Sequence, residues 1–302
     1  MTSVPFADSG RRRDLLRLAY SPCPNDTSIF HAWVHGLVAG APAAEAQLDD
    51  IDTLNRLAIE GGVDVVKVSA YAFARVREKY ALLHSGGAMG RGCGPLVVAP
   101  KDSRLAAAPS VRRVAVLADE LTRARVAVPG EHTTAALLAD LLTSGLERPV
   151  FMAFDRIMPA VAAGEVDAGV IIHEGRFTFG SYGLRRLVDL GEWWEDTTGL
   201  PLPLGGIAVR RSLETSLKAE IERAVRKSVE HARAFPEAAM EYVRAHSQEM
   251  EASVCQAHID LYVNEFTLDY GQEGEDAIRW LLEAVAGCGG IPDSDKGLFW
   301  DE

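Results

Sequence analysis

The sequence predicts an α/β fold with two lobes around an interdomain cleft, and three observations lead to that prediction. Short apolar runs alternate with stretches of helical periodicity along most of the chain, as in folds that layer helices on sheets. The length of 302 residues exceeds what one core usually holds, and about 150 residues per domain gives two domains. Segments near 92–100 and 200–206, rich in glycine or proline, predict linkers.

The two predicted linkers bracket a block with its own alternation of strands and helices. We therefore expect a discontinuous first lobe, residues 1–97 and 206–302, with a second lobe, residues 98–205, inserted into it. Because the chain would cross between the lobes twice, the connection predicts a hinge. A cleft between hinged lobes is the usual place for a ligand.

Runs of apolar residues predict the strands, and apolar positions three or four residues apart predict the helices. We expect mostly parallel sheets, because the two kinds of element alternate. The predicted strands cover residues 15–20, 46–48, 63–68, 80–83, 96–99, 125–128, 150–153, 168–172, 187–190 and 207–209. Predicted helices begin at Pro24, at Asp50 or Asp52, near Tyr71, at Thr133 and at Asp155. Further helices are predicted over residues 214–234, 236–246 and 274–286.

Segment 86–95 is dense in glycine and separates two predicted strands. Glycine in this position is typical of a loop or hinge. A phosphate cradle is the alternative, but the segment lacks the GxxxxGK[ST] pattern of such cradles.

Composition excludes several classes of protein. With 31 basic and 43 acidic residues the net charge is 31 − 43 = −12, which repels a phosphate backbone, so we expect no nucleic-acid partner. Small anions can still bind in local sites. No run of 18 apolar residues occurs, and we therefore expect no membrane insertion.

The amino-terminal sequence and the cysteines indicate the cellular compartment of the protein. Arg11–Arg13 precede two leucines, but Asp14 and Arg17 interrupt the apolar stretch that a signal peptide needs. We expect a disordered tail over about the first ten residues. The four cysteines form no CxxC pair, which favours neither a zinc site nor a disulfide framework. We therefore expect no metal, and a cytoplasmic protein.

Four polar clusters follow predicted strands, where ligands bind in open α/β sheets and where helix N-termini attract anions. The first, residues 21–26, includes Asn25, which can contact a ligand or simply cap a helix. The second is Lys67-Val68-Ser69. A lysine in an apolar strand is costly unless it is paired or faces a cavity, and a surface lysine at a strand end is the alternative.

The third cluster places Thr133, Thr134 and Ala135 at a helix start. Two adjacent threonines supply hydroxyl and N–H donors for a carboxylate or phosphate, although one threonine could serve only as the cap. The fourth is His173 at the end of an apolar strand. An imidazole there can act as a general base, while a structural histidine is the alternative.

The remaining histidines and cysteines give weaker evidence of a functional site. His31 and His35 share a helix face, but no third metal ligand is evident. Cys23 and Cys93 are the cysteines that could face the cleft, and without a placed base they are expected to be inert. We expect the remaining carboxyl-terminal histidines to face solvent: His231, His246 and His258.

Ordered motifs over about residues 15–210 resemble the 1,4-dihydroxy-6-naphthoate synthase family, which acts in the futalosine route to menaquinone. The helical carboxyl-terminal part agrees only in general. The motifs are Ser21-Pro-Cys-Pro-Asn-Asp-Thr, Phe30-His-Ala-Trp-Val-His-Gly, Asp50-Ile-Asp-Thr-Leu-Asn, Lys67-Val-Ser, Gly92-Cys-Gly-Pro, Pro129-Gly-Glu-His-Thr-Thr-Ala, Ile172-His-Glu-Gly-Arg-Phe-Thr and Trp193-Trp-Glu-Asp-Thr-Thr-Gly-Leu-Pro-Leu-Pro-Leu-Gly.

The resemblance implies a periplasmic-binding-protein-like type II fold. It also implies a lyase that converts cyclic dehypoxanthinyl futalosine, a small anionic substrate, to 1,4-dihydroxy-6-naphthoate and a three-carbon fragment, without metal or organic cofactor. The family's proton acceptor falls on His173, and its substrate-binding segments fall on residues 67–69 and 133–135. Gly175 departs from the small polar residue expected there, and Ala70 stands where some relatives carry bulkier residues.

Three other functions compete with this one. A non-catalytic solute-binding protein of the same fold would require export. A transcription-factor effector domain would require a DNA-binding module, for which the amino-terminal tail is too short. A lyase acting on a related futalosine-derived substrate would use the same polar groups.

Overall fold

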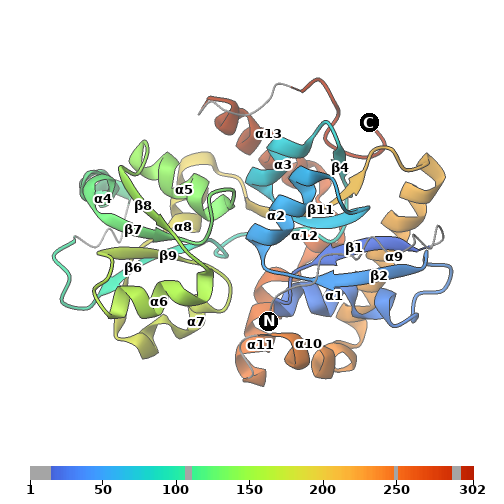
Figure 1. The fold of residues 1–302 in the computed structure, drawn as a ribbon, viewed down its shortest axis with the longest axis horizontal. Helices are drawn as coiled ribbons and strands as arrows, with labels where there is room; N and C mark the ends of the chain where they lie inside the picture. Colours follow the sequence, from blue (N-terminus) through green and yellow to red (C-terminus); the bar gives the residue numbers. More distant parts are fainter. Residues whose placement is uncertain (1–14, 106–110, 248–250, 288–293) are drawn as a thin grey trace.

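The computed structural model describes residues 15–105, 111–247, 251–287 and 294–302. The predicted amino-terminal tail and Cys288 lie outside the described residues. Figure 1 shows two groups of elements side by side, each built around its own β-sheet.

The first sheet has six strands in the spatial order β2-β1-β3-β11-β4, with β5 also paired to β11. Strand β1 lies parallel to β2 and β3, whereas β11 runs antiparallel to its three neighbours. The strands are β1 (Leu16–Tyr20), β2 (Ala44–Leu48), β3 (Val65–Ser69), β4 (Tyr80–Leu82), β5 (Ala88–Gly90) and β11 (Leu202–Arg210).

The second sheet has five strands in the order β10-β6-β9-β7-β8. Strand β7 is parallel to β8 and β9, whereas β6 is antiparallel to β9 and β10. The strands are β6 (Leu96–Pro100), β7 (Arg125–Val128), β8 (Arg148–Phe151), β9 (Ala168–Ile171) and β10 (Leu184–Asp189). Both sheets are therefore mixed, and the expectation of mostly parallel sheets is wrong because β11 and β6 enter antiparallel.

Helices cover both sheets and form the carboxyl-terminal part of the chain (Figure 1). The helices are α1 (Pro24–Val34), α2 (Ile51–Glu60), α3 (Ala70–Val76), α4 (Val111–Arg123), α5 (Thr134–Thr143), α6 (Phe154–Ala162), α7 (Gly175–Thr178), α8 (Leu190–Thr198), α9 (Thr215–Ala234), α10 (Met240–His246), α11 (Ala252–Tyr262), α12 (Glu265–Leu268) and α13 (Gly271–Gly287), with 3-10 turns η1 (Phe179–Tyr182) and η2 (Pro236–Ala239).

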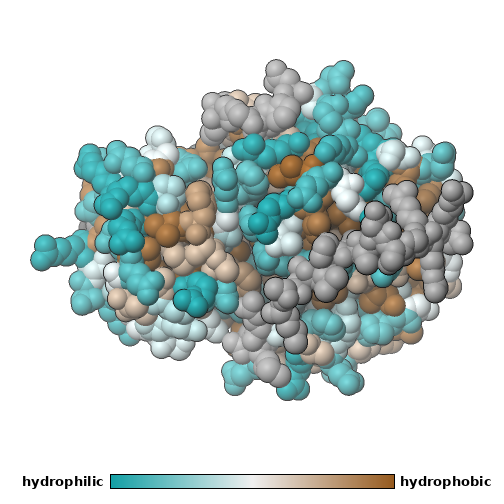
Figure 2. Space-filling model, in the orientation of Figure 1, coloured by the Kyte–Doolittle hydropathy of each residue, from teal (hydrophilic) through white to brown (hydrophobic). Residues whose placement is uncertain are grey.

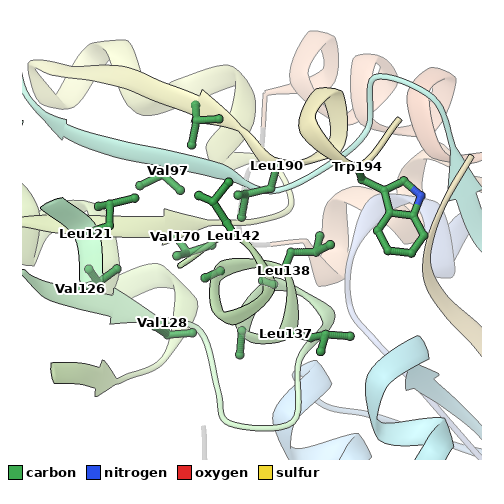
Figure 3. Packing of buried hydrophobic residues seen from close by; sticks show 14 of the residues in the cluster. Val97, Leu121, Val126, Val128, Leu137, Leu138, Leu142, Val170, Leu190 and Trp194 are labelled. Carbon is green, nitrogen blue, oxygen red and sulfur yellow. The ribbon is translucent and has the colours of Figure 1, made fainter. Parts of the chain in front are cut away.

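Apolar side chains fill the space between each sheet and its helices. In the second sheet, Val97, Val126 and Val170 pack against Leu138 of α5 (Figure 3). Burying one such side chain contributes about 1.5–3 kcal/mol, so these contacts hold α5, and the turn before it, firmly on the sheet. Figure 2 shows one outer face of the molecule, where many residues are hydrophilic and hydrophobic ones form patches on both halves.

The glycine-rich segment is packed rather than loose. It contains β5, and a Cβ on Gly94 would lie 2.3 Å from backbone atoms of Gly191. A Cβ on Gly87 would lie 2.1 Å from the hydroxyl oxygen of Tyr270. These two glycines are therefore required by close approach of neighbouring chain.

Several predicted boundaries shift. Strands occupy much of both expected linkers, because β6 covers residues 96–100 and β11 begins at Leu202. Helix α6 begins at Phe154 with Ala153 as its N-cap, so Asp155 lies inside the first turn instead of capping it. Asp50, one of the two candidates, caps α2 by accepting hydrogen bonds from the backbone N–H groups of Asp52 and Thr53.

Candidate functional site

A pocket of about 660 Å³, counting space open to solvent, lies where the two halves of the molecule meet. Seven of the predicted site residues line it: Asn25, Lys67, Ser69, Thr133, Thr134, Ala135 and His173. Val68 does not line it, because successive side chains of β3 point to opposite faces and Val68 packs into the core.

Asp26 organises the wall formed by β1 and α1. Its carboxylate is buried in the first turn of α1, where the helix dipole favours negative charge. It accepts hydrogen bonds from the hydroxyl of Ser21 at 2.7 Å, from Asn25 Nδ2 at 2.9 Å and from Lys67 Nζ at 2.6 Å. Asn25 thus both faces the pocket and holds the carboxylate.

Lys67 is buried, with 4% of its surface exposed. The alternative of a surface lysine is therefore wrong, and the ammonium is stabilised by the ion pair with Asp26. Because the pair is almost completely removed from water, the two charges keep each other in place beside the pocket.

Ser69 joins the two halves of the molecule. Its hydroxyl donates to the carbonyl oxygen of His132 at 2.6 Å and accepts from the backbone N–H of Ala72, which caps α3. Asn55 Nδ2 donates to the same carbonyl at 3.1 Å. The oxygen of His132, between β7 and α5, is therefore held by two side chains that belong to the first sheet and its helices.

The two threonine hydroxyls are both engaged within the protein. Thr133 Oγ1 caps α5 by accepting from the N–H of Ala136, and donates to the carbonyl of Gly130. Thr134 Oγ1 donates to the carbonyl of Leu204 at 2.9 Å. The backbone N–H groups of Thr134 and Ala135 have no acceptor among the described residues, so the start of α5 offers an anion two N–H donors.

His173 lies in the turn after β9 with φ of 55°. Such a conformation is uncommon for a residue other than glycine and often marks a functional position. Its Nδ1 is 3.4 Å from the Sγ of Cys23, and its ring and that of Phe154 meet edge to face. A proton on Nδ1 that points to this sulfur leaves Nε2 as a proton acceptor.

The environment keeps His173 neutral. Burial lowers the pKa of His173 below its ordinary value, and this outweighs the nearby carboxylates of Glu174 and Asp26. The neighbouring Cys23 stays a thiol, because burial raises its pKa well above the ordinary value. Burial also raises the pKa of Cys93 to about 12. The site therefore offers a neutral base and no thiolate nucleophile.

The sequence matches a family model described as menaquinone biosynthesis over residues 16–286. The chain belongs to this family. A 1,4-dihydroxy-6-naphthoate synthase from Thermus thermophilus is 50% identical over 286 residues, which cover 95% of this chain and 99% of the relative. The synthase of the same name from Streptomyces coelicolor is 49% identical over 285 residues, covering 92% and 95%. Membership of a family of biosynthetic enzymes confirms the expectation of an enzyme.

Solved structures show the same fold. A protein from Archaeoglobus fulgidus superposes with a TM-score of 0.81 at 36% identity, covering 92% of this chain and 98% of that one. The alkanesulfonate-binding protein from Xanthomonas axonopodis superposes with a TM-score of 0.61 at 16% identity, covering 84% and 86%. The second likeness shows the fold alone, and confirms the predicted periplasmic-binding-protein-like architecture.

From the sequence, no residue of the carboxyl-terminal helices is predicted to line the pocket. His258 and Tyr262 of α11 nevertheless line it, and the expectation that His258 faces solvent is wrong because its exposed fraction is 1%. Helix α11 packs against α1 and β5. The helical spacing of Cys255, Ile259 and Tyr262 marks the buried face, and would have been the signal.

Few other features of the described residues indicate a binding site. Within the described ranges, no three His, Cys, Asp or Glu side chains lie close enough to hold a metal ion. The rings of His31 and His35 contact each other and the ring of Tyr242 in tilted or edge-on arrangements. None of the helices described is both long and apolar enough to span a membrane. A Cβ on Gly175 would make only ordinary contacts, at 3.6 Å or more, so space does not explain its departure from the family pattern.

Proposed function

We propose that this chain is a carbon–carbon lyase that converts cyclic dehypoxanthinyl futalosine to 1,4-dihydroxy-6-naphthoate. The observation that carries the proposal is the neutral imidazole of His173, held in a left-handed turn on the wall of the pocket. The names of the relatives at about 50% identity support the same product.

The anionic group of the substrate binds at the start of α5. The N–H groups of Thr134 and Ala135 hydrogen-bond its carboxylate, and the helix dipole adds to the attraction. Lys67 and Ser69 line the same pocket, but their polar atoms are engaged with Asp26 and His132. They shape the binding surface more than they offer direct hydrogen bonds.

His173 removes the proton of a substrate hydroxyl group. The O–H electron pair becomes the second bond of a new carbonyl, the adjacent carbon–carbon bond breaks, and its electron pair moves into the ring system as an enolate. The imidazolium of His173 then gives this proton to the enolate that becomes the product. Aromatisation drives the reaction forward, so one base that is positioned in a pocket shielded from water is sufficient.

Closure of the cleft brings these groups together. We propose that it occurs between a lobe of residues 1–97 and 206–302 and an inserted lobe of residues 98–205. The separate sheets support this division, since β1–β5 and β11 form one and β6–β10 form the other. Small-angle scattering with and without substrate tests it: an unchanged radius of gyration would contradict closure.

The function is tested with purified protein, the cyclic intermediate and His173→Ala. The wild-type protein should form the dihydroxynaphthoate chromophore. The variant should lose kcat by about 10²–10⁴-fold, the usual contribution of general base catalysis, while it still binds substrate. His246→Ala, an exposed histidine, is the matched control. Near-normal turnover by His173→Ala would remove the assignment, and substrate recovered unchanged from wild-type protein would favour a solute-binding protein.

The pH profile gives a second check on His173. Burial lowers its pKa, so the neutral base persists below pH 6.5, the ordinary value for histidine. We expect kcat/KM to stay level down to that pH and to fall as the pH decreases through the lowered pKa. A fall that begins above pH 7 would point to another group.

A further inference from the structure

His258 of α11 is a buried histidine with an unusual lack of partners. Its exposed fraction is 1%, and neither ring nitrogen has a hydrogen-bond partner in the described part of the chain. Leaving a buried polar group without a hydrogen bond is costly, and the large majority of buried side-chain polar atoms in proteins are paired. Two unsatisfied nitrogens on one ring therefore require an explanation.

The neighbouring side chains cannot supply the missing partners. The hydroxyl of Tyr262, one turn further along α11, donates to the carbonyl of Cys93 at 3.1 Å. The ammonium of Lys67 is bonded to Asp26, and the Nδ1 of His173 faces Cys23. Because His258 lines the pocket, the partner that is left is a molecule bound in the pocket.

His258 lies opposite the proposed base. The ring centroids of His173 and His258 are 6.4 Å apart, a separation that allows one substrate to contact both imidazoles. The two rings come from different parts of the molecule, because His173 follows β9 of the second sheet and α11 packs against α1 beside the first sheet.

His258 is neutral in this environment. Burial, together with the positive charges that His173 and Lys67 can carry, holds the pKa of His258 well below its ordinary value. A neutral imidazole has one N–H donor and one acceptor nitrogen. It can therefore donate a hydrogen bond to an oxygen that becomes negative, without adding a second positive charge beside protonated His173.

We propose that His258 is a second catalytic residue, whose N–H donates to the substrate carbonyl oxygen that becomes the enolate oxygen when the carbon–carbon bond breaks. The inference rests on the proposed lyase function. In the fragmentation, the electron pair of the broken carbon–carbon bond becomes the carbon–carbon double bond of the enolate, and the π pair of the adjacent carbonyl moves to its oxygen, which receives the hydrogen bond from His258. His258 neither gains nor loses a proton, and the proton held by His173 returns to the product. Neutral imidazole donors stabilise enolates in this way in other enzymes.

The experiment compares His258→Leu, His258→Gln and the control His246→Leu, each assayed for kcat and KM with the cyclic intermediate. Loss of one donor to a developing oxyanion costs about 10²–10³-fold in kcat. We expect that loss in His258→Leu with KM changed by less than about tenfold. Glutamine keeps an N–H donor, so His258→Gln should recover at least about tenfold of the lost kcat. His246→Leu should behave as wild type.

A purely structural role would give a different result, in which the leucine and glutamine variants lose kcat equally or retain it fully. Either outcome overturns the proposal and leaves the lyase function standing, whereas no product from wild-type protein overturns both. If His258→Leu does not fold, side-chain ¹⁵N resonances of wild-type histidines are recorded while 1,4-dihydroxy-6-naphthoate is added. Unmoved resonances of His258 would overturn the proposal.

Discussion

Two sets of polar groups in the pocket are treated in opposite ways. On the wall of β1, α1 and β3, the charged groups Asp26 and Lys67 are buried and hydrogen-bonded to each other. In the turn after β9 and on α11, which belong to different halves of the molecule, His173 and His258 are kept neutral, and both ring nitrogens of His258 lack a partner among the residues described. Charge is thus fixed in the first set, and the capacity to exchange or share a proton remains in the second.

Breaking the ion pair should give the largest effect. Lys67→Met leaves the carboxylate of Asp26 buried without its cation, which typically costs 3–5 kcal/mol. We expect a loss of that size in the free energy of unfolding, measured with urea. A double variant, Lys67→Met with Asp26→Asn, removes both charges and should recover most of it. Equal stability of the single variant and wild type would show that the pair is not a fixed part of this wall.

Ser69→Ala should have the next largest effect. It removes the cap of α3 and the bond to the oxygen of His132, and leaves a backbone N–H and a carbonyl less satisfied. A loss of about 1–3 kcal/mol in the free energy of unfolding follows. Ser69→Thr keeps the hydroxyl and is the matched control. If Ser69→Ala unfolds at the wild-type urea concentration, this contact does not hold the two halves together.

Thr133→Ala should cost less, about 1 kcal/mol, since it removes the N-cap of α5. Thr133→Ser retains the oxygen and should stay close to wild type. The same two variants also test ligand binding in the pocket, because a weakened start of α5 should raise KM for the anionic substrate. A change in unfolding free energy without any change in KM would argue against substrate binding at this helix start.

Breaking a solvent-exposed ion pair should have the smallest effect on the free energy of unfolding. Arg123 and Asp119 form an ion pair on α4, with side chains 68% and 64% exposed. Arg123→Ala should change the unfolding free energy by less than about 1 kcal/mol, and less still in high salt. A loss as large as that of Lys67→Met would mean that burial does not explain the difference between the two pairs.

Local signals in the sequence were sufficient for much of this fold. Proline at the start of α1, the Asp50 cap of α2 and the apolar run of β9 each specify an element within a few residues. His173 follows directly from the end of β9, so a strand prediction places it at a sheet edge.

Contacts between distant segments explain what the sequence did not predict. Asp26 pairs with a lysine 41 residues away, and no pattern around either residue specifies the other. Short β5 pairs with β11, more than a hundred residues later in the chain. His258 enters the pocket because α11 packs on α1, and neighbours in sequence give it a polar context that suggests solvent.

The placement of the two histidines has a consequence for timing. His173 is carried by the second sheet, and His258 by a helix that packs against the other half of the molecule. Any widening of the cleft would move the proposed base away from His258, so the two imidazoles could not contact one molecule at the same time. The proposed catalytic pair would then form only while a bound substrate holds both halves of the protein together.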